Sequence, residues 1–224
     1  MKILRTLAAA LVAVAAAASA QVPAAYEPHG LFYGQRATLF DVLPVDSASI
    51  VFFGNSITNG CEWHELLGDA RVVNRGISGD IVQGLIDRAG SVVGGQPAKV
   101  FLMIGVNDIS HDVGADSIAR AVERLVDTIA VASPRTRIYL QSMLPFNNTF
   151  GRYKLLVGKE HVQREGNALL RDMAARKGIT WIDLTDIFAD SDGRLRADLT
   201  NDGLHLLGPA YLLWRERLLP YLAE

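Results

Sequence analysis

The 224-residue sequence contains a single cysteine, Cys61, which leaves no second thiol for an internal disulfide or for a thiolate metal cluster. Its five histidines are widely separated and form no His-Glu-x-x-His pattern. The formal net charge is −2, and scattered acidic and basic residues leave no basic stripe for a row of phosphates. The sequence therefore disfavours a metal site and a nucleic-acid partner, and it indicates no cofactor. Without a disulfide, we expect the stability of the fold to depend on its hydrophobic core.

Long hydrophobic runs are also missing, except at the N-terminus. Two positive charges precede an apolar segment from Leu7 to Ala18, and the small residues Ala18-Ser19-Ala20 are typical of a signal-peptidase site. The apolar segment is about 12 residues long, whereas a membrane-spanning helix needs about 20. We therefore expect residues 1–20 to be a signal peptide and the mature protein to be exported, periplasmic or secreted, with no membrane span. A membrane anchor is the alternative.

The remaining chain has the composition of one globular domain, because 50% of the sequence is hydrophobic and 21% is charged. From Ser49 on, short apolar runs alternate with longer amphipathic ones, a pattern typical of βα units in a parallel sheet. The runs expected as strands are Ile50–Phe53, Arg71–Asn74, Val100–Ile104, Ile138–Gln141 and Ile179–Ile182. We therefore predict that residues 21–224 form a single α/β domain around a five-stranded parallel sheet.

Three longer segments predict helices. Apolar residues recur at helical spacing over residues 116–132. A second helix is expected over residues 159–177, where Gly178 is well suited to end it, and a third is expected to begin near Gly208-Pro209. Residues 21–44 show no clear period and contain several Pro and Gly residues, so we expect an irregular N-terminal arm there.

The residues that indicate chemistry follow the predicted strands. In open parallel sheets, ligands bind outside the carboxyl ends of the strands. The segments at this edge are Gly54-Asn55-Ser56-Ile57-Thr58, Asn74-Arg75-Gly76-Ile77-Ser78-Gly79-Asp80, Gly105-Val106-Asn107-Asp108 and Asp202-Gly203-Leu204-His205. Each segment alone is typical of a turn or a helix cap, but their order and their common edge make the combination specific.

Together these segments resemble blocks I, II, III and V of the SGNH, or GDSL-type, hydrolase family, over about Ser49 to Leu219. The resemblance implies a three-layer αβα sandwich with a flavodoxin-like sheet. It also implies a serine esterase that cleaves carboxylic esters through an acyl-enzyme intermediate. One departure is Asn55, which stands where the family's naming motif has Asp, at a position that takes no part in proton transfer.

The resemblance assigns a role to five positions. Ser56 matches the nucleophile, and Asp202 and His205 match the rest of the catalytic triad. Gly79 and Asn107 match the oxyanion-hole residues, to which the backbone N–H of Ser56 also contributes.

The chemistry of these residue types agrees with the triad roles. A serine hydroxyl is a poor nucleophile near neutral pH and needs a base, a task that suits an imidazole. Asp202 lies three residues before His205, so one turn of chain brings its carboxylate beside the ring. In the alternative interpretation, Asp202 caps the last helix and His205 only packs.

The substrate is less well defined by the sequence. The 145–158 segment leaves the fourth strand at the same edge, and its aromatic, amide and Arg side chains suit a polar alcohol such as a sugar. The candidate substrate-binding residues are Asn55, Arg75, Phe146, Asn148 and Arg152. We therefore expect a small-molecule or glycan ester as substrate, with a short acyl group, acetyl above all, on a carbohydrate.

Other functions remain open at this point. A lysophospholipase or thioesterase would use the same triad on a longer acyl chain, and an inactive homologue would bind glycans through the same cleft. An α/β-hydrolase is disfavoured because Ser56 lacks the second Gly of G-x-S-x-G. A flavin or phosphate site at the first βα turn is a further alternative, but it leaves Asn107 and the Asp202/His205 pair without a role. A cysteine nucleophile is disfavoured because no His pattern lies near Cys61.

Overall fold

The computed structural model describes residues 22–224, so the predicted signal peptide lies outside the described residues. A parallel five-stranded sheet with the order β2-β1-β3-β4-β5 forms the centre of the molecule. Its strands are β1 (Ile50–Gly54), β2 (Val72–Gly76), β3 (Lys99–Met103), β4 (Arg137–Gln141) and β5 (Thr180–Ile182). The five predicted strands are confirmed, and no strand end differs from the prediction by more than two residues.

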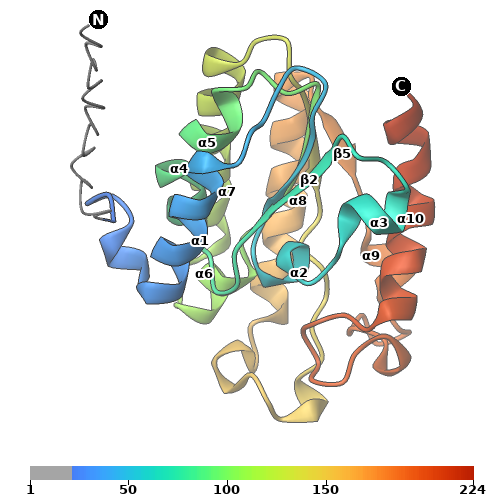
Figure 1. Ribbon diagram of the computed structural model, residues 1–224. Helices are drawn as coiled ribbons and strands as arrows, with labels where there is room; N and C mark the ends of the chain where they lie inside the picture. The colour runs from blue at the N-terminus through green and yellow to red at the C-terminus, as the bar shows by residue number, and fades with distance from the viewer. Residues whose placement is uncertain (1–21) are drawn as a thin grey trace, which may run out of the picture.

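Helices cover both faces of the sheet and produce three layers (Figure 1). Helices α4, α5, α7 and α8 lie on one face, and α3, α9 and α10 lie on the other. The helices are α1 (Leu31–Val42), α2 (Ser56–Asn59), α3 (Trp63–Leu67), α4 (Val82–Asp87), α5 (Gly90–Val93), α6 (Val106–Ser110), α7 (Ala115–Ala132), α8 (Glu160–Lys177), α9 (Thr185–Phe188) and α10 (Gly208–Ala223). Short 3-10 turns occupy Glu27–His29, Asn148–Phe150, Lys154–Leu156 and Ala197–Leu199. No helix within residues 22–224 has both the length and the apolar character needed to cross a bilayer.

The three predicted helices correspond to α7, α8 and α10. Helix α7 buries an apolar stripe at helical spacing, from Ile118 to Ile129. Helix α8 ends at Lys177, and Gly178 adopts the left-handed conformation with φ of 65° that glycine tolerates best. Helix α10 begins at Gly208 with Pro209 in its first turn.

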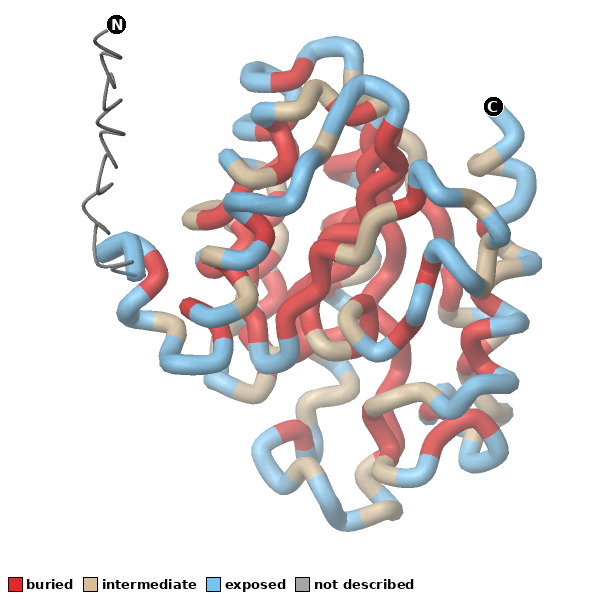
Figure 2. Tube along the Cα trace, in the orientation of Figure 1, coloured by how far each residue is buried: buried red, intermediate tan, exposed pale blue. Residues whose placement is uncertain are grey.

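The core lies along both faces of the two central strands, as the buried segments in Figure 2 show. Strands β1 and β3 are buried over their whole length, and their near-continuous apolar sequence is typical of a parallel strand covered on both sides. On the face under α10, aromatic rings stack across three strands. Their centroids are 4.0 Å apart for Trp63 and Phe52, 5.0 Å for Phe52 and Phe101, and 4.6 Å for Phe101 and Tyr139.

The prediction of an irregular arm over residues 21–44 is wrong for Leu31–Val42, which form α1. The helix buries Tyr33, Ala37 and Phe40, a stripe at helical spacing. The stripe is hard to recognise in the sequence because apolar residues also lie on the exposed side, such as Leu31 and Val42. A pattern that is apolar on both sides shows little periodicity, although one side packs against the domain.

Candidate active site

The exit from β1 presents Ser56 at the carboxyl edge of the sheet. Gly54 ends the strand, and a side chain there would collide with Thr58 and with the carbonyl of Met103, so this tight turn requires glycine. Asn55 then caps α2, because its Oδ1 accepts an N–H from the first turn at 3.0 Å. Ser56 is consequently the first residue of α2 and remains partly exposed.

Three side chains from opposite ends of the sequence form a hydrogen-bonded chain at this edge. Ser56 Oγ lies 2.9 Å from His205 Nε2, although the two residues are 149 positions apart. On the far side of the ring, His205 Nδ1 lies 2.8 Å from Asp202 Oδ2. Helix α10 begins only at Gly208, so Asp202 does not cap it, and the interpretation of His205 as a packing residue is wrong.

Local backbone geometry orients the Asp202 carboxylate. Its Oδ1 accepts the N–H groups of Leu204 at 2.9 Å and His205 at 2.8 Å. Partial burial alone would raise the pKa of Asp202, but hydrogen bonds from the His205 ring and from these N–H groups outweigh burial and lower the pKa to about 2. Asp202 is therefore ionised near neutral pH and favours a proton on His205 Nδ1, which leaves Nε2 free to accept the proton of Ser56.

Tyr153 is a fourth member of this group that the sequence interpretation missed. Its hydroxyl donates to Asp202 Oδ2 at 3.0 Å and lies 2.9 Å from His205 Nδ1. Burial and the hydrogen bond to Asp202 raise the pKa of Tyr153 to about 12, so the phenol stays protonated. Its only sequence signal is an aromatic residue in the long segment after β4, which does not indicate that the ring turns toward His205.

Three N–H donors lie at the same edge. The backbone N–H groups of Ser56 and Gly79 have no acceptor among residues 22–224. The Asn107 side chain donates one amide hydrogen to the carbonyl of Asp80 at 2.8 Å and has a second one to offer. Gly79 has a φ of 84°, a conformation that favours glycine.

A buried ion pair fixes the Gly79 loop to the strand that precedes Ser56. Arg88 and Asp80 are fully buried and 2.8 Å apart. The Arg88 guanidinium also donates to the carbonyls of Gly54 at 3.0 Å and Arg75 at 2.8 Å, at the ends of β1 and β2. One guanidinium thus joins both strand ends that lead into the site. The sequence predicts no role for Arg88 or Asp80, because burial of a charged residue has no local signature.

A second buried carboxylate supports the same loop. Asp108 accepts the N–H of Val82, the first residue of α4, at 3.2 Å. Burial raises the pKa of Asp108 to about 6 although this hydrogen bond opposes the shift. Asp108 follows Asn107 in α6, so the backbone just after Gly79 is tied at Asp80 and at Val82 to the turn that carries the Asn107 amide.

We expect Arg88→Met to lower the free energy of unfolding by about 3–5 kcal/mol, because it leaves the buried Asp80 carboxylate without its partner. Urea unfolding followed by circular dichroism measures this loss. Arg124→Met, on the exposed surface of α7, is the matched control and is expected to change the value by about 0.5 kcal/mol or less. A loss no larger than that of the control would contradict the prediction.

Several predicted substrate-binding residues are not available to a substrate. Asn55 is buried and caps α2, and Phe146 is buried in the core. Arg75 is buried as well, and its guanidinium donates to the carbonyls of Leu43 and Pro44 under α1. The predictions for these three residues are wrong, because a place beside the site in the sequence does not decide which way a side chain turns.

The other two predicted substrate-binding residues differ from each other. Asn148 uses its amide to join the loop to the start of α8, donating to Glu160 at 2.6 Å. Arg152 is exposed on the same loop, one residue before Tyr153, and its role stays a prediction.

Cys61 is buried, and burial raises the pKa of its thiol to about 12, which disfavours a nucleophilic thiolate.

Comparison with known proteins places the chain in one family. The profile of the GDSL-like lipase/acylhydrolase family matches residues 52–211. The platelet-activating factor acetylhydrolase IB subunit alpha2 of Rattus norvegicus is 25% identical over 173 residues, which cover 72% of this chain and 70% of that protein.

Solved structures share the fold. A candidate platelet activating factor from Streptococcus pneumonia is 29% identical, with a TM-score of 0.75 over 84% of this chain and 91% of that one. An acetylxylan esterase from Geobacillus stearothermophilus is 19% identical, with a TM-score of 0.64 over 81% of this chain and 97% of that one. The chain belongs to the GDSL-like lipase/acylhydrolase family and is an ester-hydrolysing enzyme.

Proposed function

We propose that the protein is a serine esterase in which Ser56 attacks the acyl carbonyl and His205 accepts the hydroxyl proton. The 2.9 Å contact between Ser56 Oγ and His205 Nε2 carries this proposal, because a nucleophile and its base must lie within hydrogen-bonding reach. Asp202 fixes the ring and stabilises the imidazolium that forms. The imidazolium then protonates the leaving alcohol, and an acyl-Ser56 ester remains.

Hydrolysis of that ester completes the cycle. His205 accepts a proton from a water molecule, whose oxygen attacks the acyl carbonyl, and Ser56 leaves as the alcohol with the proton returned by His205. Both attacks place negative charge on the carbonyl oxygen. The N–H groups of Ser56 and Gly79 and the Asn107 amide are the donors proposed to stabilise that oxyanion.

Asn107→Ala is expected to lower kcat by about 10²- to 10³-fold, because it removes one oxyanion donor. Steady-state hydrolysis of p-nitrophenyl acetate measures the loss, and circular dichroism checks the fold. Asn201→Ala, an exposed amide in the turn before Asp202, is the matched control and is expected to keep the wild-type rate. Wild-type kcat in folded Asn107→Ala protein would remove Asn107 from the mechanism.

The proposed substrate is a short-chain ester, acetyl above all, on a carbohydrate. Two of the related proteins are named for acetyl esters, the acetylhydrolase of Rattus norvegicus and the acetylxylan esterase of Geobacillus stearothermophilus. The alcohol part of the ester differs between these two names, and the acetyl group is the part that they share. Arg152, which is exposed on the loop that carries Tyr153, favours a hydroxyl-rich alcohol over an alkyl chain.

A panel of esters tests this proposal. We expect hydrolysis of p-nitrophenyl acetate and of acetylated xylose, with kcat/KM falling as the acyl chain lengthens. A preference for chains of about eight carbons or more would favour the lysophospholipase or thioesterase alternative instead. Labelling of folded protein by a fluorophosphonate at Ser56 supports the esterase, and its absence would favour an inactive glycan-binding homologue.

Export is also proposed, on the basis of the signal-like residues 1–20. The N-terminus of the mature protein, recovered from the periplasm or from the culture medium, is then expected at or near Gln21.

A further inference from the structure

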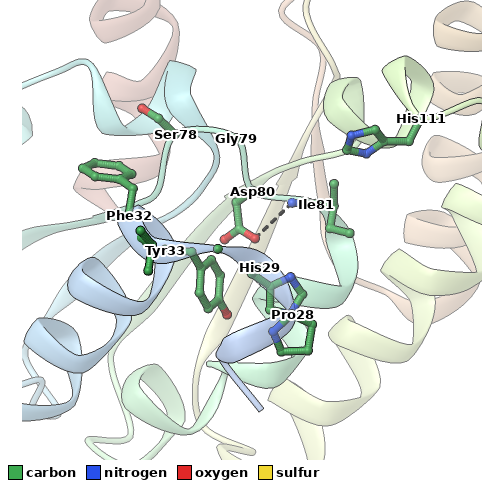
Figure 3. Close-up of a pocket in the computed structure, with 11 residues that line it drawn as sticks. Pro28, His29, Phe32, Tyr33, Ser78, Gly79, Asp80, Ile81 and His111 are labelled. Atoms are coloured by element: carbon green, nitrogen blue, oxygen red, sulfur yellow. Dashed lines mark hydrogen bonds between the residues drawn. The ribbon is translucent and has the colours of Figure 1, made fainter. Parts of the chain in front are cut away.

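A cavity of about 340 Å³ lies between α1 and the loop after β2. One wall consists of residues 28–33, and the opposite wall consists of residues 78–81 and His111 (Figure 3). In this view Phe32 and Ser78 lie on one side, and His111 lies on the other. The volume falls at the lower end of the range of about 300–1,000 Å³ that is typical of small-molecule sites.

The cavity adjoins the proposed catalytic centre on its oxyanion side. Gly79, one of the proposed oxyanion donors, is part of its wall. Ser78 Oγ donates to Asn59 Oδ1 at 3.1 Å, and Asn59 ends the short helix that begins with Ser56. His111 follows α6 as its C-cap residue, four positions after Asn107, and its backbone N–H donates to the carbonyl of Asn107. A group in the cavity would lie beside Gly79, one of the donors proposed to hold the carbonyl oxygen of an ester at Ser56.

Packing against α4 fixes the N-terminal wall. Tyr33 is buried, and its hydroxyl donates to the carbonyl of Gly84. His29 Nε2 lies 2.7 Å from Asp87 Oδ2, so a second side chain joins the same wall to α4. The cavity is consequently formed by docked elements, as expected for a binding site that is largely preformed.

The side chains of the cavity match one kind of alcohol. Phe32, which is 49% exposed, contributes an aromatic ring that lies on the same side as Ser78 (Figure 3). Ser78 and His111 are exposed and offer hydroxyl and imidazole groups for hydrogen bonds. A sugar ring has an apolar C–H face that packs on an aromatic ring and hydroxyls that satisfy such polar groups. A long alkyl chain would instead desolvate Ser78 and His111 without replacing their hydrogen bonds.

We propose that this cavity is a subsite for the sugar ring of the ester's alcohol, with Phe32 as the stacking surface. The inference rests on the proposed esterase function and adds to it the position of the carbohydrate. It also assigns a binding role to α1, a helix that precedes the first strand.

Two esters with the same acyl group distinguish binding of the sugar ring from the hydrolysis step itself. One is acetylated methyl xylopyranoside, and the other is ethyl acetate, whose alcohol has no ring. The quantity compared is the selectivity ratio, which is kcat/KM for the sugar ester divided by kcat/KM for ethyl acetate. We expect Phe32→Ala and His111→Ala each to lower this ratio by about ten-fold, mainly because KM for the sugar ester rises.

Two controls accompany these variants. Phe32→Tyr keeps the ring and is expected to hold the ratio within about two-fold of wild type. Leu39→Ala changes an exposed side chain of α1 that does not line the cavity, and it is expected to leave the ratio unchanged. Melting temperatures equal to wild type show that each variant is folded.

The outcomes distinguish the inference from the function on which it rests. If wild-type protein hydrolyses both esters and folded Phe32→Ala and His111→Ala keep the wild-type ratio, the subsite is wrong and the esterase stands. If wild-type protein hydrolyses neither ester and no other short-chain ester, the proposed function fails, and the subsite fails with it.

Discussion

Ser56→Ala is expected to lower kcat for p-nitrophenyl acetate by at least about 10⁴-fold, because no acyl-enzyme can form without the hydroxyl. The substitution removes one oxygen from a partly exposed side chain, so the fold is expected to persist. The residual rate above the uncatalysed reaction would come from the oxyanion donors and from substrate binding. Steady-state kinetics measures the loss, and mass spectrometry after fluorophosphonate treatment shows whether labelling disappears with it.

The matched control is Ser117→Ala, an exposed serine on α7. It is expected to keep wild-type kcat and to be labelled like wild type. If folded Ser56→Ala protein retained more than about one hundredth of wild-type kcat, the nucleophile would have to be a different residue.

Asp202→Asn is expected to lower kcat by about 10⁴-fold with the fold intact. The carboxamide oxygen can still accept the backbone N–H groups that now bond to Oδ1, so the turn keeps its geometry. The amide NH₂ would then face His205 Nδ1 and favour the tautomer that has the proton on Nε2. In that tautomer the ring cannot accept the proton of Ser56.

Kinetics across pH and a thermal melt test this prediction. The loss is expected mainly in kcat, because Asp202 acts through His205 and not on the substrate. Asp198→Asn, an exposed carboxylate in the preceding 3-10 turn, is the control and is expected to keep the wild-type rate. A ten-fold or smaller loss in folded Asp202→Asn would show that Tyr153, which also contacts His205 Nδ1, is enough to orient the ring.

Much of the fold is evident in local patterns. The alternation of apolar runs with amphipathic segments predicts the parallel sheet, since each run is a strand and the runs of β1 and β3 are buried on both faces. The spacing in α7 and the glycine after α8 define two helices almost to the residue. These predictions succeed because the signals depend on residues within a few positions of one another. Helix α1 was missed for the corresponding reason, since exposed apolar residues hide its buried stripe.

The sequence by itself determined which residue types lie at the carboxyl edge of the sheet, because the position of each strand along the chain and the residues that follow it are local properties. Only the tertiary structure decided which side chains turn toward one another. It brought Tyr153 to Asp202 and His205, buried Arg88 against Asp80, and turned Arg75 away under α1. The Tyr153–Asp202 and Arg75–Leu43 contacts join residues 49 and 32 positions apart, and no short window of sequence specifies them. Arg88 and Asp80 are only 8 positions apart, but their burial depends on the strand ends that pack around them.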